Sequence, residues 1–138
     1  LTAAMVEAAI TPKTKVIIVN SPNNPTGAVI AQEEFARIVA LAHQKGVYVL
    51  TDECYSQLVY EGTPYSAAAL PDAKNTVIVS GSLSKNYAMT GWRIGFTLSP
   101  APIAKAMGTL QSQSTSNPTS VAQKAAVEAL LGPQDSIP

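Results

Sequence analysis

Short apolar runs and helix-spaced apolar positions alternate along this chain. Residues 15–20, KVIIVN, form a β-branched run closed by the turn-rich SPNNPTG, which is typical of a strand that is buried on both faces and ends in a loop. In residues 31–45 apolar side chains recur at helical spacing, glutamates occupy the first turn, and Gly46 follows the last turn. This pattern predicts an amphipathic helix after the first strand.

The alternation continues through the rest of the sequence. Three more strands and two more helices are expected, in this order, at residues 47–51, 76–80, 93–98, 102–110 and 118–131. Asn117 is the expected N-cap of the last helix, with Pro118 at the first helical position and Gly132 as its stop. Strands that alternate with helices predict an α/β fold with a mainly parallel sheet, because parallel neighbours need crossover connections.

Composition narrows the class of protein. The chain has 138 residues, 46% of them hydrophobic and 13% charged, which is the make-up of one globular domain or part of one. Nine acidic residues balance nine lysines and arginines, so no strong field favours nucleic acid or an anionic membrane as a partner. The single cysteine excludes an internal disulfide, no metal-ligand pattern is present, and no apolar run is long enough to cross a bilayer. We expect a cytoplasmic protein without a bound metal.

Both ends of the sequence suggest that more chain exists. It begins with LTAAMVEAAITP, without an initiator methionine and inside an expected short helix, and it stops at GPQDSIP just after another helix. These ends predict an excerpt from a longer protein.

Polar residues gather where the expected strands end. They follow the first, second and third strands and comprise Asn23, Asn24, Thr26, Asp52, Tyr55, Ser80, Ser82, Ser84 and Lys85. In open parallel sheets, ligands bind outside the carboxyl ends of the strands. We therefore expect these three clusters to meet at one site.

The stretch SGSLSKNYAMTGWRIGF, residues 80–96, places Lys85 eight residues before Arg93 in a Ser/Gly-rich setting. That spacing suits a covalent aldehyde cofactor whose phosphate needs a counter-charge. Taken singly, each candidate has an ordinary structural interpretation. Lys85 would be an exposed lysine, Arg93 an ion-pair partner, and Asp52 and Asn24 strand-end and turn residues.

Three motifs in series carry a family resemblance. NSPNNPTG, then TDECY, then SGSLSKNYAMTGWRIGF resemble the class I aminotransferases, the fold type I enzymes that use pyridoxal 5′-phosphate. The resemblance covers essentially the whole chain but only the middle portion of the usual enzyme. The tail LQSQSTSNPTSVAQKAAVEAL looks like the bacterial aspartate aminotransferase branch.

The resemblance implies catalytic roles for three residues. Lys85 would form the internal Schiff base and then move the proton between the substrate Cα and the cofactor C4′ as general base and acid. Asp52 would pair with the pyridine nitrogen, because a negative charge favours the protonated ring that withdraws electrons from Cα. Tyr55 would hydrogen-bond the 3′-oxygen of the cofactor and tune the Schiff-base proton.

The remaining cofactor contacts are also implied by the resemblance. Asn24 would join Tyr55 at the 3′-oxygen, and the peptide before Pro25 is a candidate cis bond, as the family often has there. Three side chains would hold the phosphate, where a guanidinium can make a bidentate contact and hydroxyl groups add donors. These are Arg93, Ser82 and Ser84.

The resemblance further implies a place in a known fold. The chain would be residues 1–138 of a partial large, cofactor-binding domain within a three-layer sandwich, without the small domain and the N-terminal part of the large domain. Its strand order would be 4-3-1-2 with the fourth strand antiparallel, so that a switch point lies near the first strand. A phosphate-binding glycine segment, a ring-stacking aromatic residue and an arginine for the substrate α-carboxylate have no matching positions here.

The expected activity is pyridoxal-phosphate-dependent transamination from an amino acid to a 2-oxo acid, by a homodimeric parent in amino-acid metabolism. Ser112 stands where one branch of aspartate aminotransferases has an arginine that binds the distal carboxylate of the substrate. No arginine at this position can therefore bind that carboxylate here. Aspartate with 2-oxoglutarate is the leading substrate pair, and aromatic or alanine-type donors stay open. The alternatives are a lyase or synthase on the same scaffold, or a noncatalytic structural fragment. We expect the isolated chain to be weakly active or inactive.

Overall fold

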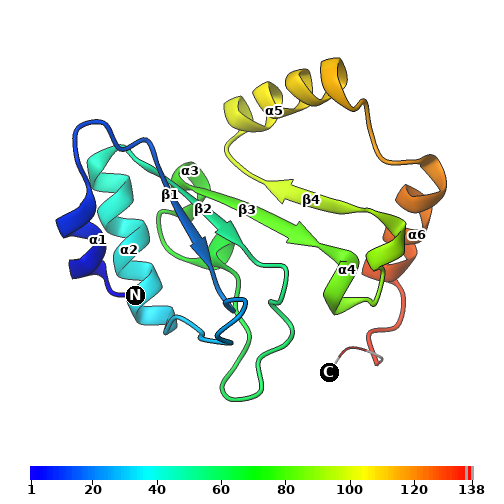
Figure 1. The fold of residues 1–138 in the computed structure, drawn as a ribbon, viewed down its shortest axis with the longest axis horizontal. Helices are drawn as coiled ribbons and strands as arrows, with labels where there is room; N and C mark the ends of the chain where they lie inside the picture. Colours follow the sequence, from blue (N-terminus) through cyan, green and yellow to red (C-terminus); the bar gives the residue numbers. More distant parts are fainter. Residues whose placement is uncertain (136, 138) are drawn as a thin grey trace.

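A computed structural model describes residues 1–135 and 137 as a mixed α/β fold around one four-stranded sheet (Figure 1). The strands are β1 (Val16–Asn20), β2 (Tyr48–Asp52), β3 (Val77–Ser82) and β4 (Gly95–Leu98). The helices are α1 (Ala3–Ala9), α2 (Gln32–Lys45), α3 (Ala73–Thr76), α4 (Leu83–Asn86), α5 (Ala101–Ser114) and α6 (Ser120–Leu131), with 3-10 turns η1 (Ala67–Ala69) and η2 (Thr90–Trp92). The predicted fold class and every predicted strand and helix are confirmed.

The order of the strands differs from the prediction. β1, β2 and β3 are parallel neighbours in that order, and β4 pairs with β3 in the antiparallel direction, as expected. The predicted order 4-3-1-2 is wrong for the two inner places, because β2 and not β1 lies beside β3. Successive strands joined by a crossover usually become neighbours, and β1 is left at the edge with Ile18 74% exposed. No strand is skipped, so these four strands form no switch point near β1.

The larger core lies between α2 and one face of the sheet. α2 contributes Phe35, Ile38, Val39 and Ala42, which recur at helical spacing and are all buried. The strands and the segment before β3 contribute Val19, Val49, Ala67, Leu70, Ala73, Val77 and Val79. Gly46 ends α2 in the left-handed region at φ 65°, as its position predicted.

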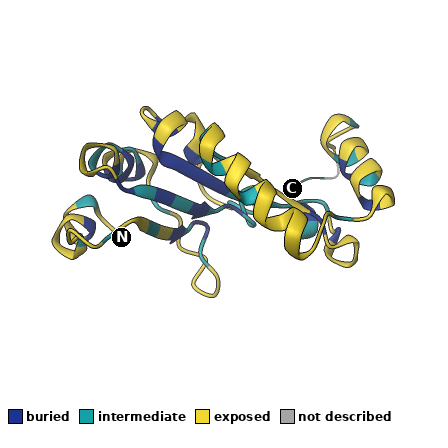
Figure 2. Ribbon diagram, turned by 90° about the horizontal axis from the view of Figure 1, so that it is seen from above, coloured by how far each residue is buried: buried dark blue, intermediate teal, exposed yellow. Residues whose placement is uncertain are grey.

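A smaller cluster joins α6 to the segment after β3. It consists of Leu83, Met89, Ile94, Ala122 and Ala126. By contrast, α5 has no buried residue, and Figure 2 shows it almost wholly in the colour of exposed positions. The N-cap of α6 is Thr119, whose hydroxyl oxygen accepts a hydrogen bond from the Ala122 amide at 3.3 Å. The predicted cap Asn117 instead donates to the Pro118 carbonyl, so that prediction is wrong.

Candidate functional site

The carboxyl ends of the three parallel strands are aligned residue by residue. Asn20 of β1 pairs with Asp52 of β2, and Asp52 pairs with Ser80 of β3. Side chains alternate along a strand, and the positions before Asn20 and Asp52, Val19 and Thr51, are buried on the α2 side. Asn20, Asp52 and Ser80 therefore lie in a row on the opposite face. The strand ends are thus neighbours along one edge of the sheet, and the meeting of the three loop clusters at one site stays a prediction.

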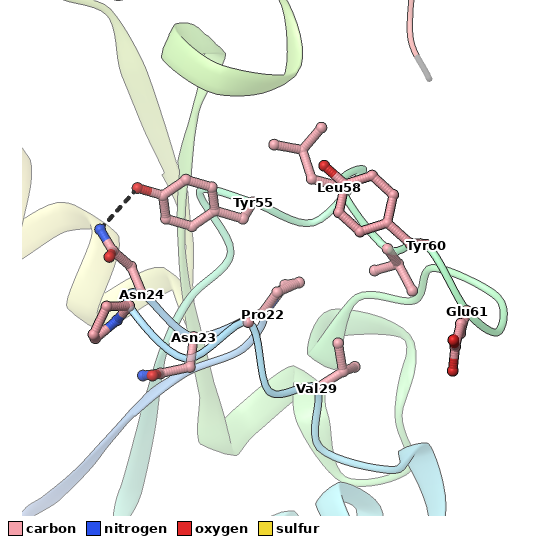
Figure 3. A pocket seen from close by; sticks show the side chains of 11 residues that line it. Pro22, Asn23, Asn24, Val29, Tyr55, Leu58, Tyr60 and Glu61 are labelled. Atoms are coloured by element: carbon pink, nitrogen blue, oxygen red, sulfur yellow. Dashed lines mark hydrogen bonds between the residues drawn. The ribbon is translucent and has the colours of Figure 1, made fainter.

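Asn24 and Tyr55 come from the loops after β1 and β2 and are in direct contact. The Asn24 side-chain amide donates a hydrogen bond to the Tyr55 hydroxyl oxygen at 3.1 Å (Figure 3). The peptide between Asn24 and Pro25 is cis, as expected from the sequence, and the peptide before Pro22 is cis as well. The structure thus joins two candidate residues that lie 31 positions apart in the sequence.

Asn20 is a polar residue of the site that the sequence argument overlooked. Its side-chain amide donates to the Asp52 carbonyl at 3.2 Å. Its side-chain oxygen accepts from the Asn24 amide at 2.9 Å and from the Asn23 side chain at 3.3 Å. The available signal was an asparagine that closes a β-branched run, directly before the turn-rich loop. Its partners could not be known without the register of β1 against β2.

Asp52 is half-buried at the end of β2. One of its carboxylate oxygens, Oδ1, accepts a hydrogen bond from the Cys54 amide at 3.0 Å. This bond closes the turn after the strand, and Tyr55 follows within the same turn. The carboxylate is therefore held by its own backbone at the aligned strand ends.

A second group of candidates lies beyond the end of β3. Ser82 caps α4, and its hydroxyl oxygen accepts from the Ser84 amide at 3.1 Å. The Thr90 hydroxyl donates to the Ser84 carbonyl at 3.0 Å, and the Arg93 guanidinium donates to the Thr90 carbonyl at 2.9 Å. Thr90 was not singled out from the sequence, although it links two predicted phosphate-binding residues. Arg93 itself adopts a left-handed backbone with φ 51° and is exposed.

Lys85 lies in the single turn of α4, directly after β3. Leu83, which is 1% exposed, anchors this turn in the smaller core cluster. The Lys85 side chain is exposed and makes no side-chain hydrogen bond or ion pair with the residues that the structure describes. The structure brings Asn24 and Tyr55 together and places Asp52 at the same edge, but none of the described candidates forms a hydrogen bond or ion pair with the Lys85 ammonium.

A cavity of about 640 Å³ opens between the loops after β1 and β2 (Figure 3). Asn24 and Pro22 face it from the first loop, and Tyr55 and Leu58 face it from the second. Tyr60, which is 91% exposed, stands at its rim. The Asn24–Tyr55 hydrogen bond therefore borders an open space large enough for a small-molecule group.

The donor set of the strand ends fits pyridoxal phosphate chemically. Asp52 supplies a carboxylate suited to a protonated ring nitrogen, and the Asn24–Tyr55 pair supplies donors for a phenolic oxygen. Arg93, Ser82 and Ser84 supply a guanidinium and two hydroxyl groups, which suit a phosphate. Lys85 supplies an exposed amine for an aldehyde.

Behind the site lies a buried carboxyl group, that of Glu53. It is 8% exposed, and its Oε1 accepts from the Ala67 amide at 2.8 Å. Burial raises the pKa of this carboxyl group above its usual 4.5, while hydrogen bonds from Ala67 and the Ser66 side chain act in the lowering direction. Nearby, burial and the charges of Glu53 and Glu33 raise the pKa of Tyr65 to about 12, and its hydroxyl donates to the Ile30 carbonyl at 2.7 Å.

Two features are absent from the part of the chain that the structure describes. None of the helices in these residues combines the length and the hydropathy that a membrane span requires. Within the same residues, no three His, Cys, Asp or Glu side chains are grouped closely enough to hold a metal ion.

Comparison with known proteins identifies the family. Residues 1–138 match the family described as Aminotransferase class I and II. The aspartate aminotransferase of Bacillus sp. (strain YM-2) is 45% identical over 139 residues, covering 99% of this chain and 36% of that protein. The aspartate/prephenate aminotransferase of Cereibacter sphaeroides is 46% identical, covering 98% of this chain and 34% of that protein.

A solved structure agrees with the sequence comparisons. The crystal structure of the aspartate aminotransferase from Rhizobium meliloti matches with a TM-score of 0.90 and 43% identity, covering 98% of this chain and 34% of that one. The chain thus spans about a third of the length of the relatives it matches. By sequence over its full length, and by fold, the chain belongs to the class I and II aminotransferase family.

Proposed function

We propose that this chain is the cofactor-binding part of an aminotransferase that moves the amino group of an amino acid to a 2-oxo acid. Members of the family use pyridoxal phosphate. The observation that carries the proposal is the hydrogen bond between Asn24 and Tyr55, because it brings donors from two separate loops together at the sheet edge where β2 ends in Asp52. A structural fragment without a site has no need for this arrangement.

The proposed roles follow from the chemistry of each side chain. When bound, pyridoxal phosphate supplies an electron-withdrawing ring that stabilises negative charge at the substrate Cα. Lys85 would hold the cofactor at its aldehyde carbon, with water as the leaving group, and its free amine would move the proton at the substrate Cα. Asp52 holds the proton on the ring nitrogen, and Asn24 and Tyr55 donate to the 3′-oxygen.

The phosphate half of the proposed site uses exposed groups beyond β3. Arg93 binds the phosphate through charge-assisted hydrogen bonds, and Ser82 and Ser84 add hydroxyl donors. Ser82 and Ser84 are already joined through the Ser84 amide, and the Thr90 bridge keeps Arg93 near them. These contacts support the proposed grouping of the phosphate-binding residues.

Aspartate with 2-oxoglutarate is the proposed substrate pair. The names of the Bacillus and Rhizobium relatives support aspartate, and the Cereibacter name adds prephenate as a substrate of that protein. A panel of amino acids, supplied to the protein that contains this chain, tests the proposal through the 2-oxo acid formed. Release of ammonia and pyruvate, with no amino group passed to a second 2-oxo acid, would instead establish lyase chemistry.

The proposal extends to the rest of the protein. Because the chain spans about a third of its relatives, the remaining large domain and a small domain would supply the substrate arginine and the ring-stacking residue. A homodimer would complete each site, in the cytoplasm where amino acids and 2-oxo acids are available. Sedimentation of the longer protein with and without cofactor tests the dimer.

Cofactor binding by the chain itself is tested with Lys85. Incubation with pyridoxal phosphate is expected to give a bound-cofactor absorbance that is absent from Lys85→Ala, since the amine is then missing. Lys105→Ala removes a lysine from the exposed helix α5 and is the matched control. Equal absorbance in Lys85→Ala and the wild type would overturn the role of Lys85.

A further inference from the structure

Asn20 occupies the junction between two parts of the site. It is the last residue of β1 and the direct partner of Asp52 in the parallel pairing of β1 with β2. Its side chain is half-buried, so its hydrogen bonds are partly shielded from water. From this place one side chain reaches both the end of β2 and the loop that carries Asn24.

The two ends of the Asn20 amide have different partners. The nitrogen donates to the Asp52 carbonyl at 3.2 Å, and the oxygen accepts from the Asn24 backbone amide at 2.9 Å. A primary amide offers a donor and an acceptor from one planar group. Alanine offers neither, and aspartate offers acceptors alone.

These contacts close a ring of interactions around the proposed cofactor site. Asn20 is hydrogen-bonded to the Asn24 amide, and the Asn24 side chain is hydrogen-bonded to the Tyr55 hydroxyl. Tyr55 belongs to the turn that the Asp52 carboxylate closes by accepting from the Cys54 amide. The ring returns to Asn20 through the Asp52 carbonyl. The residue with the carboxylate proposed for the ring nitrogen is thereby connected through hydrogen bonds to the pair proposed for the 3′-oxygen.

We infer that Asn20 is a positioning residue, which sets the placement of Asp52 relative to the Asn24–Tyr55 pair and so tunes how the site holds its cofactor. The effect of Asn20 on cofactor binding rests on the proposed function. The hydrogen-bond bridge itself does not depend on that function. Misplacing Asp52 or the pair weakens two opposite contacts to one rigid ring, so a small displacement affects both.

The first test uses the chain without cofactor. Hydrogen exchange of the Asn24 backbone amide is measured in the wild type, Asn20→Ala, Asn20→Asp and Asn75→Ala. Asn75 lies exposed in α3 and is the matched control. Exchange is expected to be about tenfold faster in Asn20→Ala, because the acceptor is lost, and close to wild type in Asn20→Asp, which keeps an acceptor. Equal exchange in all four proteins would overturn the bridge.

The second test adds pyridoxal phosphate. The dissociation constant is expected to rise about tenfold in Asn20→Ala and less in Asn20→Asp, with a displaced pH midpoint of the bound-cofactor absorbance in both. Asn75→Ala is expected to match the wild type. A lower melting temperature in Asn20→Ala with unchanged affinity and pH midpoint would overturn the positioning role, since Asn20 would then act on stability alone.

The design separates the inference from the proposed function. Absence of a Lys85-dependent absorbance in the wild-type chain contradicts cofactor binding by this chain, whatever the Asn20 variants do. In that case the exchange rate of the Asn24 amide still supports or overturns the bridge. A normal absorbance in the wild type with no response to either Asn20 variant overturns the inference and leaves the proposed function standing.

Discussion

The two halves of the proposed site differ in how firmly the chain holds them. The first half, formed by β1, α2, β2 and the loops after the two strands, lies on a closed core in which Ile38, Val39 and Ala42 are fully buried. The second half, formed by α4, η2, β4, α5 and α6, has the small cluster around Leu83 as its core among the described residues. All four residues of β4 are exposed, and α5 buries none.

The hydrogen bonds of the candidate site residues follow the same division. In the first half, side chains bond to side chains and across strands, as Asn24 does to Tyr55 and Asn20 to Asp52. In the second half, Thr90 and Arg93 donate to nearby backbone carbonyls, and the Lys85 side chain is exposed. The chain therefore preorganises the contacts proposed for the ring nitrogen and the 3′-oxygen more firmly than those proposed for the phosphate and the aldehyde.

The largest expected effect comes from removing the core beneath the first half. Ile38→Ala leaves a cavity between α2 and the sheet and is expected to lower the free energy of unfolding by about 2–5 kcal/mol. Leu110→Ala removes a comparable side chain from α5, where it is 72% exposed, and is expected to change stability by less than about 0.5 kcal/mol. Urea unfolding of both variants measures the contrast, and similar losses would show that the two halves are equally packed.

A smaller effect is expected from a close backbone approach in the second half. A Cβ atom at Gly95 would lie 2.6 Å from the Gly81 carbonyl oxygen, and this oxygen belongs to the paired strand β3. Gly95→Ala is therefore expected to cost about 1–3 kcal/mol by forcing β4 away from β3. Gly91→Ala, in the same motif, meets no atom within 4 Å and is the control. Equal melting temperatures for the two variants would mean that β4 moves to accommodate the added Cβ atom without a loss of stability.

Features of the structure that depend on local sequence were predicted well, and features that depend on long-range contacts were not. Hydrophobic spacing located β1, α2 and β2 to within one or two residues, since each element has a period of its own. The order of β1 and β2 beside β3 was wrong, because neighbours in a sheet are chosen by burial and crossover geometry rather than by local spacing.

The candidate site was also predicted unevenly. The placement of Asn24 and Tyr55 in one site follows from motif resemblance, but the bridge made by Asn20 depends on cross-strand register, which no local pattern encodes. At the start of α6, Asn117 and Thr119 are both good capping residues two positions apart, and the capping preference alone does not choose between them. Helices of four residues such as α4 are too short to produce a periodic signal.

The smallest expected effect concerns the buried carboxyl group behind the first half, and it appears only as a dependence on pH. Because burial raises the pKa of Glu53, the folded chain binds its proton more tightly than the unfolded chain does. The stability that Glu53 contributes is complete below the unfolded value of 4.5 and is lost as the pH rises through the raised pKa. Glu53→Gln keeps an acceptor for the Ala67 amide but cannot ionise. The urea midpoint of Glu53→Gln is therefore expected to increase relative to that of the wild type as the pH rises from about 4 to about 7. Glu7→Gln on the exposed side of α1 controls for the loss of one carboxylate, and a constant difference between Glu53→Gln and the wild type over this range would contradict the argument.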